Sequence, residues 1–143
     1  MSLMGELKLF LGFQISQSTS GICLTQSKYA KEVLKEFEMD SAKAIDTPMC
    51  STTKLDNFES EKSVDQTLYR GIIRSLLYLS ASRPDIMYSV GVCARFQANP
   101  KLSNLSAVKR ILRYIKGSID LGLFYPSGTK FNLMSYSDAD FGG

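Results

Sequence analysis

The chain has 143 residues, of which 44% are hydrophobic and 22% charged, and its formal net charge is +3. This length and composition are typical of one soluble globular domain, and no apolar run reaches the roughly 20 residues that a membrane-spanning helix needs. Histidine is absent, which excludes Ser-His-Asp and Cys-His catalysis and any histidine-bound metal. Because the N-terminal residues also lack the order of a signal peptide, we expect a cytoplasmic or nuclear location.

The N-terminal segment has the pattern of a β-hairpin followed by a helix. Residues 7–15 alternate well enough for a strand, and after a polar turn residues 22–25 return as its partner. This interpretation puts Gly12 in the middle of the first strand. Ser27 is a candidate N-cap for a short amphipathic helix over residues 28–38.

The middle of the chain divides into a polar connector and three helices. Residues 40–66 are rich in Ser, Thr, Asp and Lys and show no sustained apolar period, which indicates an extended, mostly exposed connector. Helical spacing of apolar residues follows over 67–82, from Pro84 to about residue 99, and over 103–116. Pro84 suits the first turn of the second of these helices.

The C-terminal segment predicts a second strand pair. Residues 121–125 and 131–137 are the two strands, joined by a turn at residues 126–129. The expected fold class is therefore α+β, with an N-terminal hairpin, a mostly helical middle and a C-terminal strand pair.

The three cysteines, Cys23, Cys50 and Cys93, are odd in number and widely spaced. Neither a disulfide framework nor a zinc cluster fits this arrangement. We expect buried free thiols.

Charge is distributed unevenly along the chain. Between residues 32 and 65 there are nine acidic residues and four lysines, whereas between 67 and 117 there are nine basic residues and one acidic residue, Asp85. On the last predicted helix, three basic residues recur at i, i+4 and i+7. Such a face tracks phosphates without reading bases, or is the solvated side of an ordinary helix. The three residues are Lys109, Arg113 and Lys116.

Tyrosines are interleaved with these basic residues. They are candidates for stacking on bases, or they are edges of the hydrophobic core. They are Tyr69, Tyr78, Tyr88 and Tyr114.

Asp138 and Asp140 stand two residues apart at the end of the last predicted strand. Their side chains point the same way if the strand continues, so they can share a divalent cation. A surface turn is the alternative, because two carboxylates are a weak ligand set for Mg²⁺.

Seven short segments, in this order, closely resemble the Pol polyprotein of copia-type retrotransposons. They are residues 5–12 (GELKLFLG) with 14–15 (QI), 26–31 (QSKYAK), 48–49 (PM), 69–79 (YRGIIRSLLYL), 82–86 (SRPDI), 107–117 (AVKRILRYIKG) and 136–140 (YSDAD). Each motif is weak alone, but the ordered series is specific and runs the length of the chain.

The resemblance implies four regions. The first hairpin is similar to the primer grip of reverse transcriptase, with Phe10, Leu11 and Gly12 at its centre. A helix and acidic connector similar to the thumb follow, then basic helices of the thumb and connection, then the truncated start of a ribonuclease H fold. The corresponding ranges are 1–26, 27–66, 67–117 and 118–143.

By the same resemblance, Asp138 corresponds to the first metal-binding carboxylate of ribonuclease H. The polymerase aspartates and the later ribonuclease H carboxylates of the family are not among the 143 residues, and two-metal phosphoryl transfer needs a carboxylate cluster. We therefore expect a polyprotein fragment that is not an enzyme and needs no cofactor alone, whereas the intact parent performs RNA-directed DNA synthesis with Mg²⁺.

The partners implied are an RNA–DNA hybrid or duplex nucleic acid, bound weakly and without sequence preference, together with the missing palm and ribonuclease H remainder. No membrane partner is expected. Two alternatives stay open. One is a stand-alone, non-catalytic nucleic-acid-binding module, and the other is a protein-interaction domain.

Overall fold

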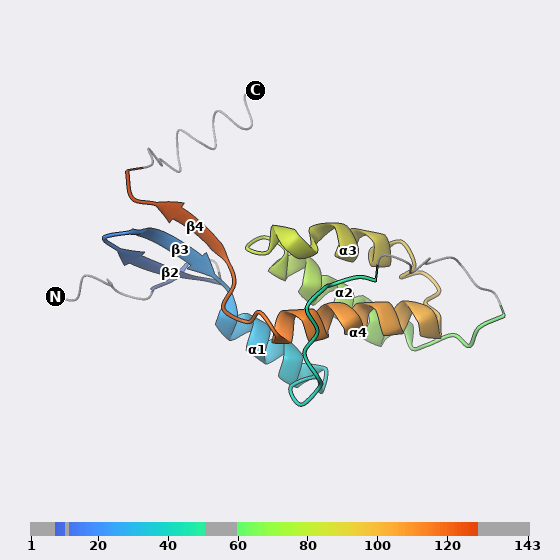
Figure 1. Cartoon of the computed structure of the whole chain (residues 1–143). Helices are drawn as coiled ribbons and strands as arrows, with labels where there is room; N and C mark the ends of the chain where they lie inside the picture. The colour runs from blue at the N-terminus through green and yellow to red at the C-terminus, as the bar shows by residue number, and fades with distance from the viewer. Residues whose placement is uncertain (1–7, 11, 51–59, 129–143) are drawn as a thin grey trace, which may run out of the picture.

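The computed structural model describes residues 8–10, 12–50 and 60–128, which form one four-stranded antiparallel sheet beside four helices (Figure 1). The expected α+β class is confirmed. The strands occur in the order β1-β2-β3-β4 across the sheet. Their bounds are β1 Lys8–Phe10, β2 Phe13–Ser18, β3 Gly21–Thr25 and β4 Leu123–Pro126. The helices are α1 Ser27–Glu36, α2 Gln66–Leu79, α3 Pro84–Ala94 and α4 Leu102–Lys116.

The first predicted strand is two strands. Phe10 pairs with Phe13, so the chain reverses over two residues, and Gly12 lies in this turn with a φ of +82°. Tight hairpin turns of this length require positive φ, which glycine adopts without a steric penalty. The prediction that Gly12 lies within a strand is therefore wrong.

The strand near residue 123 exists, but it belongs to the N-terminal sheet. Leu123 of β4 pairs with Leu24 of β3, and Tyr125 pairs with Ile22. The expected partner strand at residues 131–137 lies outside the described residues. The segment predicted to begin a separate ribonuclease H fold thus contributes its first strand to the sheet that contains the primer-grip-like hairpin.

The four helices enclose the hydrophobic core. Each helix buries one stripe at the predicted helical spacing. The buried apolar residues include Val33 and Leu34 of α1, Ile72, Ile73, Leu76 and Leu79 of α2, Ile86, Val90 and Cys93 of α3, and Val108, Ile111, Leu112 and Ile115 of α4.

The described residues of the polar connector are mostly exposed, as predicted, but the connector also lies against α4 at both ends (Figure 1). The amide of Ile45 donates to the carbonyl of Arg113 at 3.3 Å. Further along, the amide of Val64 donates to the carbonyl of Pro100 at 2.9 Å, and Leu102 donates to Lys62 at 3.1 Å. Backbone hydrogen bonds therefore join the connector to both ends of α4.

Helix α3 starts at Pro84 as predicted but ends at Ala94, before the expected stop near residue 99. The amides of Phe96 and Gln97 donate to carbonyls three residues earlier, a tighter spacing than the four residues of an α-helix. The side-chain amide of Gln66 then donates to the carbonyl of Ala98 at 2.7 Å. This contact holds the end of α3 against the start of α2.

Candidate nucleic-acid interface

The β1–β2 turn sits on the helices. A Cβ placed on Gly12 would come 2.1 Å from the hydroxyl oxygen of Tyr78 in α2. Tyr78 in turn meets Tyr29 of α1, with ring centroids 4.8 Å apart at an interplanar angle of 69°. The hydroxyl of Tyr78 therefore occupies the space that a side chain at position 12 would need. Phe10 lies in β1 and Leu11 lies outside the described residues.

The hairpin also holds the start of α1. The side-chain oxygen of Gln14 accepts a hydrogen bond from the amide of Lys28 at 2.7 Å and from the hydroxyl of Ser27 at 2.9 Å. A helix leaves its first amides without partners, and here a strand residue satisfies one of them. Ser27 is thus not the N-cap that the sequence predicts; Gln26 holds that position. The turn and the first residues of α1 form one unit.

Helix α1 presents lysines beside that turn. Lys28, Lys31 and Lys35 are all exposed, and none has a hydrogen bond or ion pair from its side chain to a described residue. Their spacing of i, i+3 and i+7 keeps them on one side of the helix. The residues predicted from the sequence do not include them, although their spacing alone was a sufficient signal.

The cationic face predicted on α4 is largely occupied by the connector. The Nε of Arg113 donates to the carbonyl of Lys43 at 2.8 Å, and the Nζ of Lys116 donates to the carbonyl of Asp40. Lys109 is exposed. One donor of each of Arg113 and Lys116 is thus hydrogen-bonded to a connector carbonyl, and both residues are half-buried. Their role in binding nucleic acid stays a prediction.

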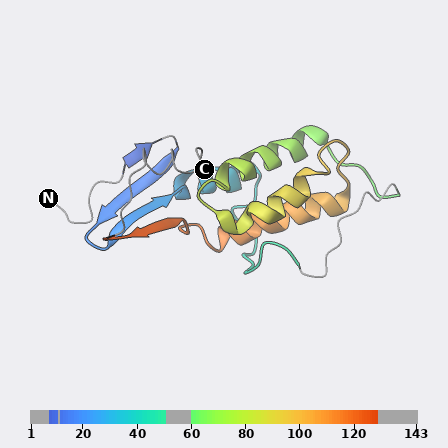
Figure 2. The ribbon, with the colours of Figure 1, turned by 90° about the horizontal axis from the view of Figure 1, so that it is seen from above.

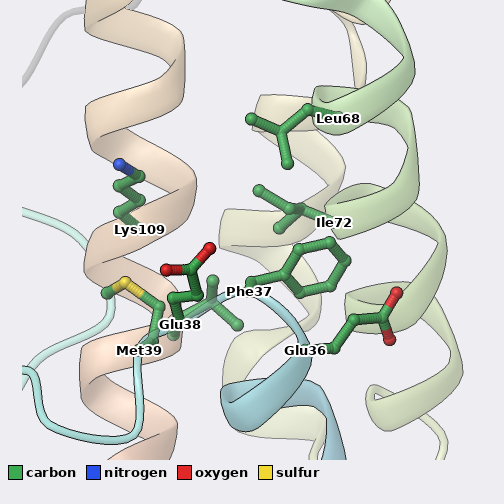
Figure 3. Close-up of a pocket in the computed structure, with 8 residues that line it drawn as sticks. Glu36, Phe37, Glu38, Met39, Leu68, Ile72 and Lys109 are labelled. Atoms are coloured by element: carbon green, nitrogen blue, oxygen red, sulfur yellow. The ribbon is translucent and has the colours of Figure 1, made fainter.

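Lys109 borders a cavity of about 310 Å³ between α1, α2 and α4 (Figure 3). Figure 3 shows Lys109, Glu38 and Met39 along one side and Phe37, Leu68 and Ile72 along the other. The lining is apolar with charges at the rim.

The chain is 41% identical over 138 residues to the retrovirus-related Pol polyprotein from transposon RE1 of Arabidopsis thaliana, a match that covers 96% of this chain and 9% of that protein. The corresponding polyprotein from transposon RE2 of the same plant is 38% identical over 96% of this chain and 10% of its own length. Nearly the whole chain is therefore similar to copia-type retrotransposon Pol polyproteins. The resemblance seen in the sequence motifs is confirmed.

The Pol-related chain spans about a tenth of the length of these polyproteins. It also matches the uncharacterized mitochondrial protein AtMg00810 of Arabidopsis thaliana, with 36% identity over 100% of this chain and 59% of that protein. No protein-family model and no solved structure matches the chain.

One Pol-like motif, residues 82–86, forms a half-buried polar junction. The guanidinium of Arg83 is paired with both carboxylate oxygens of Asp85, at 3.1 and 3.0 Å, and the hydroxyl of Tyr114 donates to Asp85 at 2.5 Å. Ser82 donates to the side-chain oxygen of Gln26 at 2.6 Å. Arg83 is only 2% exposed, so it adds nothing to the basic surface counted from the sequence.

This junction shifts two pKa values. Partial burial opposes ionisation of Asp85, but the hydrogen bonds from Arg83 and Tyr114 outweigh it and lower the pKa of the carboxyl group below its ordinary 3.8. The hydrogen bond to the Asp85 carboxylate, aided by burial, raises the pKa of the Tyr114 hydroxyl. Both shifts favour an ionised Asp85 carboxylate next to a neutral Tyr114 hydroxyl.

The tyrosines divide between core and surface. Tyr69 is fully buried, and its hydroxyl donates to the carbonyl of Cys93 at 2.6 Å. Burial raises the pKa of Tyr69, and burial likewise raises the pKa of the Cys93 thiol to about 11. Cys93 is a buried thiol as predicted, whereas Cys23 and Cys50 are partly exposed. Tyr88 is 76% exposed and is the tyrosine best placed to meet a partner.

The predicted metal ligands Asp138 and Asp140 lie outside the described residues. Within the described part of the chain, no three His, Cys, Asp or Glu side chains gather closely enough to hold a metal ion. Among the same residues, no helix combines the length and apolar character that crossing a membrane requires.

Proposed function

We propose that this chain is the part of a retrotransposon reverse transcriptase polyprotein that contacts the backbone of an RNA–DNA hybrid or duplex, and that it has no catalytic activity alone. Similarity to Pol polyproteins over nearly the whole chain supports the first half. The main support for the binding surface is the hydrogen bond from the backbone amide of Lys28 to the side-chain oxygen of Gln14. This bond joins the primer-grip-like hairpin to the helix that bears the lysines, α1.

The chemistry of this surface suits phosphates. Seven residues separate Lys28 from Lys35, which corresponds to about 10 Å along a helix axis. Ammonium groups at this spacing neutralise successive phosphates and release counterions, a sequence-independent source of affinity. Glu32 and Glu36 are also exposed on α1 and reduce its net charge, so binding is weak.

The residues of α4 take a secondary role in this proposal. Lys109 is exposed, but Arg113 and Lys116 are bound to connector carbonyls. The donor that each gives to the connector is not available to a phosphate. Their removal therefore lowers stability before it lowers affinity.

The proposed lack of catalysis is argued from the metal ligands that phosphoryl transfer requires. Two-metal phosphoryl transfer needs several converging carboxylates. The described residues offer no such group, and a metal at Asp138 with Asp140 has too few ligands for this chemistry. Mg²⁺ is expected to act only with the palm and ribonuclease H parts of an intact parent polyprotein.

Paired charge reversals test the binding surface. We expect Lys31→Glu with Lys35→Glu to weaken binding of a fluorescent 20-base-pair RNA–DNA hybrid about tenfold, for any sequence, and to lower the slope of log affinity against log salt by roughly 1.8. Lys43→Glu with Lys62→Glu is the matched control, because both residues are exposed, lie outside α1 in the sequence and carry the same change in charge. Equal losses in the two double variants, or binding that depends on base sequence, would contradict the proposal.

A stand-alone module with no polyprotein parent is the second candidate, favoured by the similarity to the uncharacterized mitochondrial protein AtMg00810, of which this chain covers 59%. An antibody against the chain distinguishes the two. A stand-alone module is detected as a small protein, whereas a polyprotein segment is detected within a much larger precursor or its processed products.

A further inference from the structure

The outer side of the α2–α3 hairpin combines exposed apolar side chains with exposed arginines. Apolar side chains are exposed at its centre, with Leu77 49%, Met87 55% and Tyr88 76% accessible. Exposed arginines flank them on both helices. We call this surface the α2–α3 face and define it by Arg70, Arg74, Leu77, Met87, Tyr88 and Arg95.

These residues lie on two adjacent helices and, in the case of Arg95, directly after the second. Helices α2 and α3 are joined by four residues and run side by side in opposite directions (Figure 2). The hydrogen bonds from Tyr69 to Cys93 and from Gln66 to Ala98 fix their register, so the arginine end of α2 faces the Arg95 end of α3. Gly91 of α3 is also exposed, and a Cβ placed there would meet no atom within 4 Å.

The composition of the face is that of a protein interface. Neither α2 nor α3 contains a lysine or a glutamate, whereas the exposed side of α1 consists largely of both. Interfaces between proteins are enriched in Tyr, Met and Arg and depleted in Lys and Glu, and Tyr and Arg are frequent binding hot spots. Helix α3 is also apolar on both its inner and outer sides, which is typical of a helix covered on both.

The charge of the face selects the partner. Arg70, Arg74 and Arg95 form no ion pair with any described residue, so three guanidinium groups surround the apolar centre without a counterion. An amphipathic helix with apolar residues along one side and carboxylates beside them satisfies both features, since its apolar stripe covers Leu77 and Met87 while its carboxylates pair with the arginines.

We propose that the juxtaposition of exposed Leu77, Met87 and Tyr88 with three unpaired arginines makes the α2–α3 face a docking surface for an acidic amphipathic helix of a protein partner. A nucleic-acid backbone fits less well, because phosphates pair with the arginines but leave Leu77 and Met87 exposed to water. The surface is separate from the α1 lysines and does not depend on their function.

A designed probe tests this docking surface. It is a fluorescein-labelled helical peptide of 18 residues with leucines at i, i+3, i+4 and i+7 and glutamates on both flanks, measured by anisotropy against the whole chain. We expect binding that Met87→Ala with Tyr88→Ala weakens about fivefold or more, and Arg74→Glu with Arg95→Glu about tenfold or more. Lys31→Glu with Lys35→Glu is the control and leaves peptide binding unchanged.

Two competitors complete the test. A peptide with every glutamate replaced by lysine is expected not to bind, and an unlabelled RNA–DNA hybrid is expected not to displace the acidic peptide. The proposal is overturned if the acidic peptide fails to bind, if the lysine peptide binds equally well, or if the hybrid displaces the acidic peptide. Thermal melting of each variant ensures that a loss of binding does not reflect unfolding, which is not expected because all four substituted positions are exposed.

Discussion

The guanidinium of Arg83 donates to both the carbonyl oxygen of Ser118, at 3.0 Å, and its hydroxyl oxygen, at 2.7 Å. Ser118 follows the end of α4, just before the chain enters β4, while Arg83 precedes the first residue of α3. This contact therefore fixes the start of α3 against the end of α4, close to where the chain continues into β4.

Removing that guanidinium should be strongly destabilising. Arg83→Met leaves Asp85 without its ion-pair partner and Ser118 without its donors in a half-buried site, so we expect a loss of about 3 kcal/mol in the free energy of unfolding. Arg74→Met is the matched control, because Arg74 is exposed and has no ion pair with a described residue. Its change should stay within about 0.5 kcal/mol in urea denaturation. Equal effects in the two variants would show that the junction contributes nothing specific.

Acid should weaken the same junction. The pKa of Asp85 in the folded chain lies below its ordinary 3.8, so the unfolded chain binds the proton more tightly and stability falls as the pH drops below about 4. Asp85→Asn cannot titrate and should flatten this part of the profile of unfolding free energy against pH, while lowering stability at neutral pH. A variant that shows the same loss below pH 4 as the parent chain would assign the acid sensitivity to other carboxyl groups.

The Gly12–Tyr78 contact predicts a specific non-additivity. Gly12→Ala is strained twice, by the φ of +82° and by a Cβ 2.1 Å from the Tyr78 hydroxyl oxygen, and we expect a loss of about 2 kcal/mol. Tyr78→Phe removes the hydroxyl and leaves the Cζ atom, 3.0 Å away, as the nearest neighbour. The double variant should therefore be more stable than the sum of the two single losses predicts, by about 1 kcal/mol in a thermal-unfolding cycle. Strict additivity would mean that the turn moves away from α2.

The sequence predicted the helices well because their information is local. The apolar spacing in α2 and α4 identified both to within a few residues, and Pro84 marked the start of α3. The turn at Gly12 was missed because Leu-Gly lacks the Asn-Gly or Asp-Gly signature of a tight hairpin, and the alternation of residues 7–15 continues through it.

What the sequence did not predict depends on contacts between distant segments. The pairing of β4 with β3 joins residues about one hundred positions apart, and no local pattern specifies the partner of a strand. Arg113 and Lys116 of α4 donate to backbone carbonyls of the connector. Every residue has a backbone carbonyl, so the amino-acid composition gives no sign of these contacts. The α1 lysines recur at i, i+3 and i+7, a helical spacing as clear as that of the α4 residues, but their connection to the hairpin depends on the contact with Gln14.

Glu38 offers a test in which a substitution should stabilise the chain. It follows α1 with a φ of +57°, where its amide donates to Lys35 at 3.1 Å and the amide of Met39 donates to Leu34 at 2.7 Å. These are the two hydrogen bonds of a Schellman motif, whose left-handed residue is usually glycine because a Cβ there is strained. Glu38→Gly should therefore raise the free energy of unfolding by about 0.5–1 kcal/mol, the relief of strain being partly offset by the greater freedom of glycine in the unfolded chain.

Lys35→Gly, three residues earlier and inside α1, is the control. There φ is helical, so the same change to glycine should cost about 1 kcal/mol. Opposite signs at positions 38 and 35 in urea denaturation would identify backbone conformation as the cause. If Glu38→Gly also destabilises, the carboxylate beside Lys109 at the rim of the cavity contributes more than the strain costs, and Lys109→Met should then abolish that contribution.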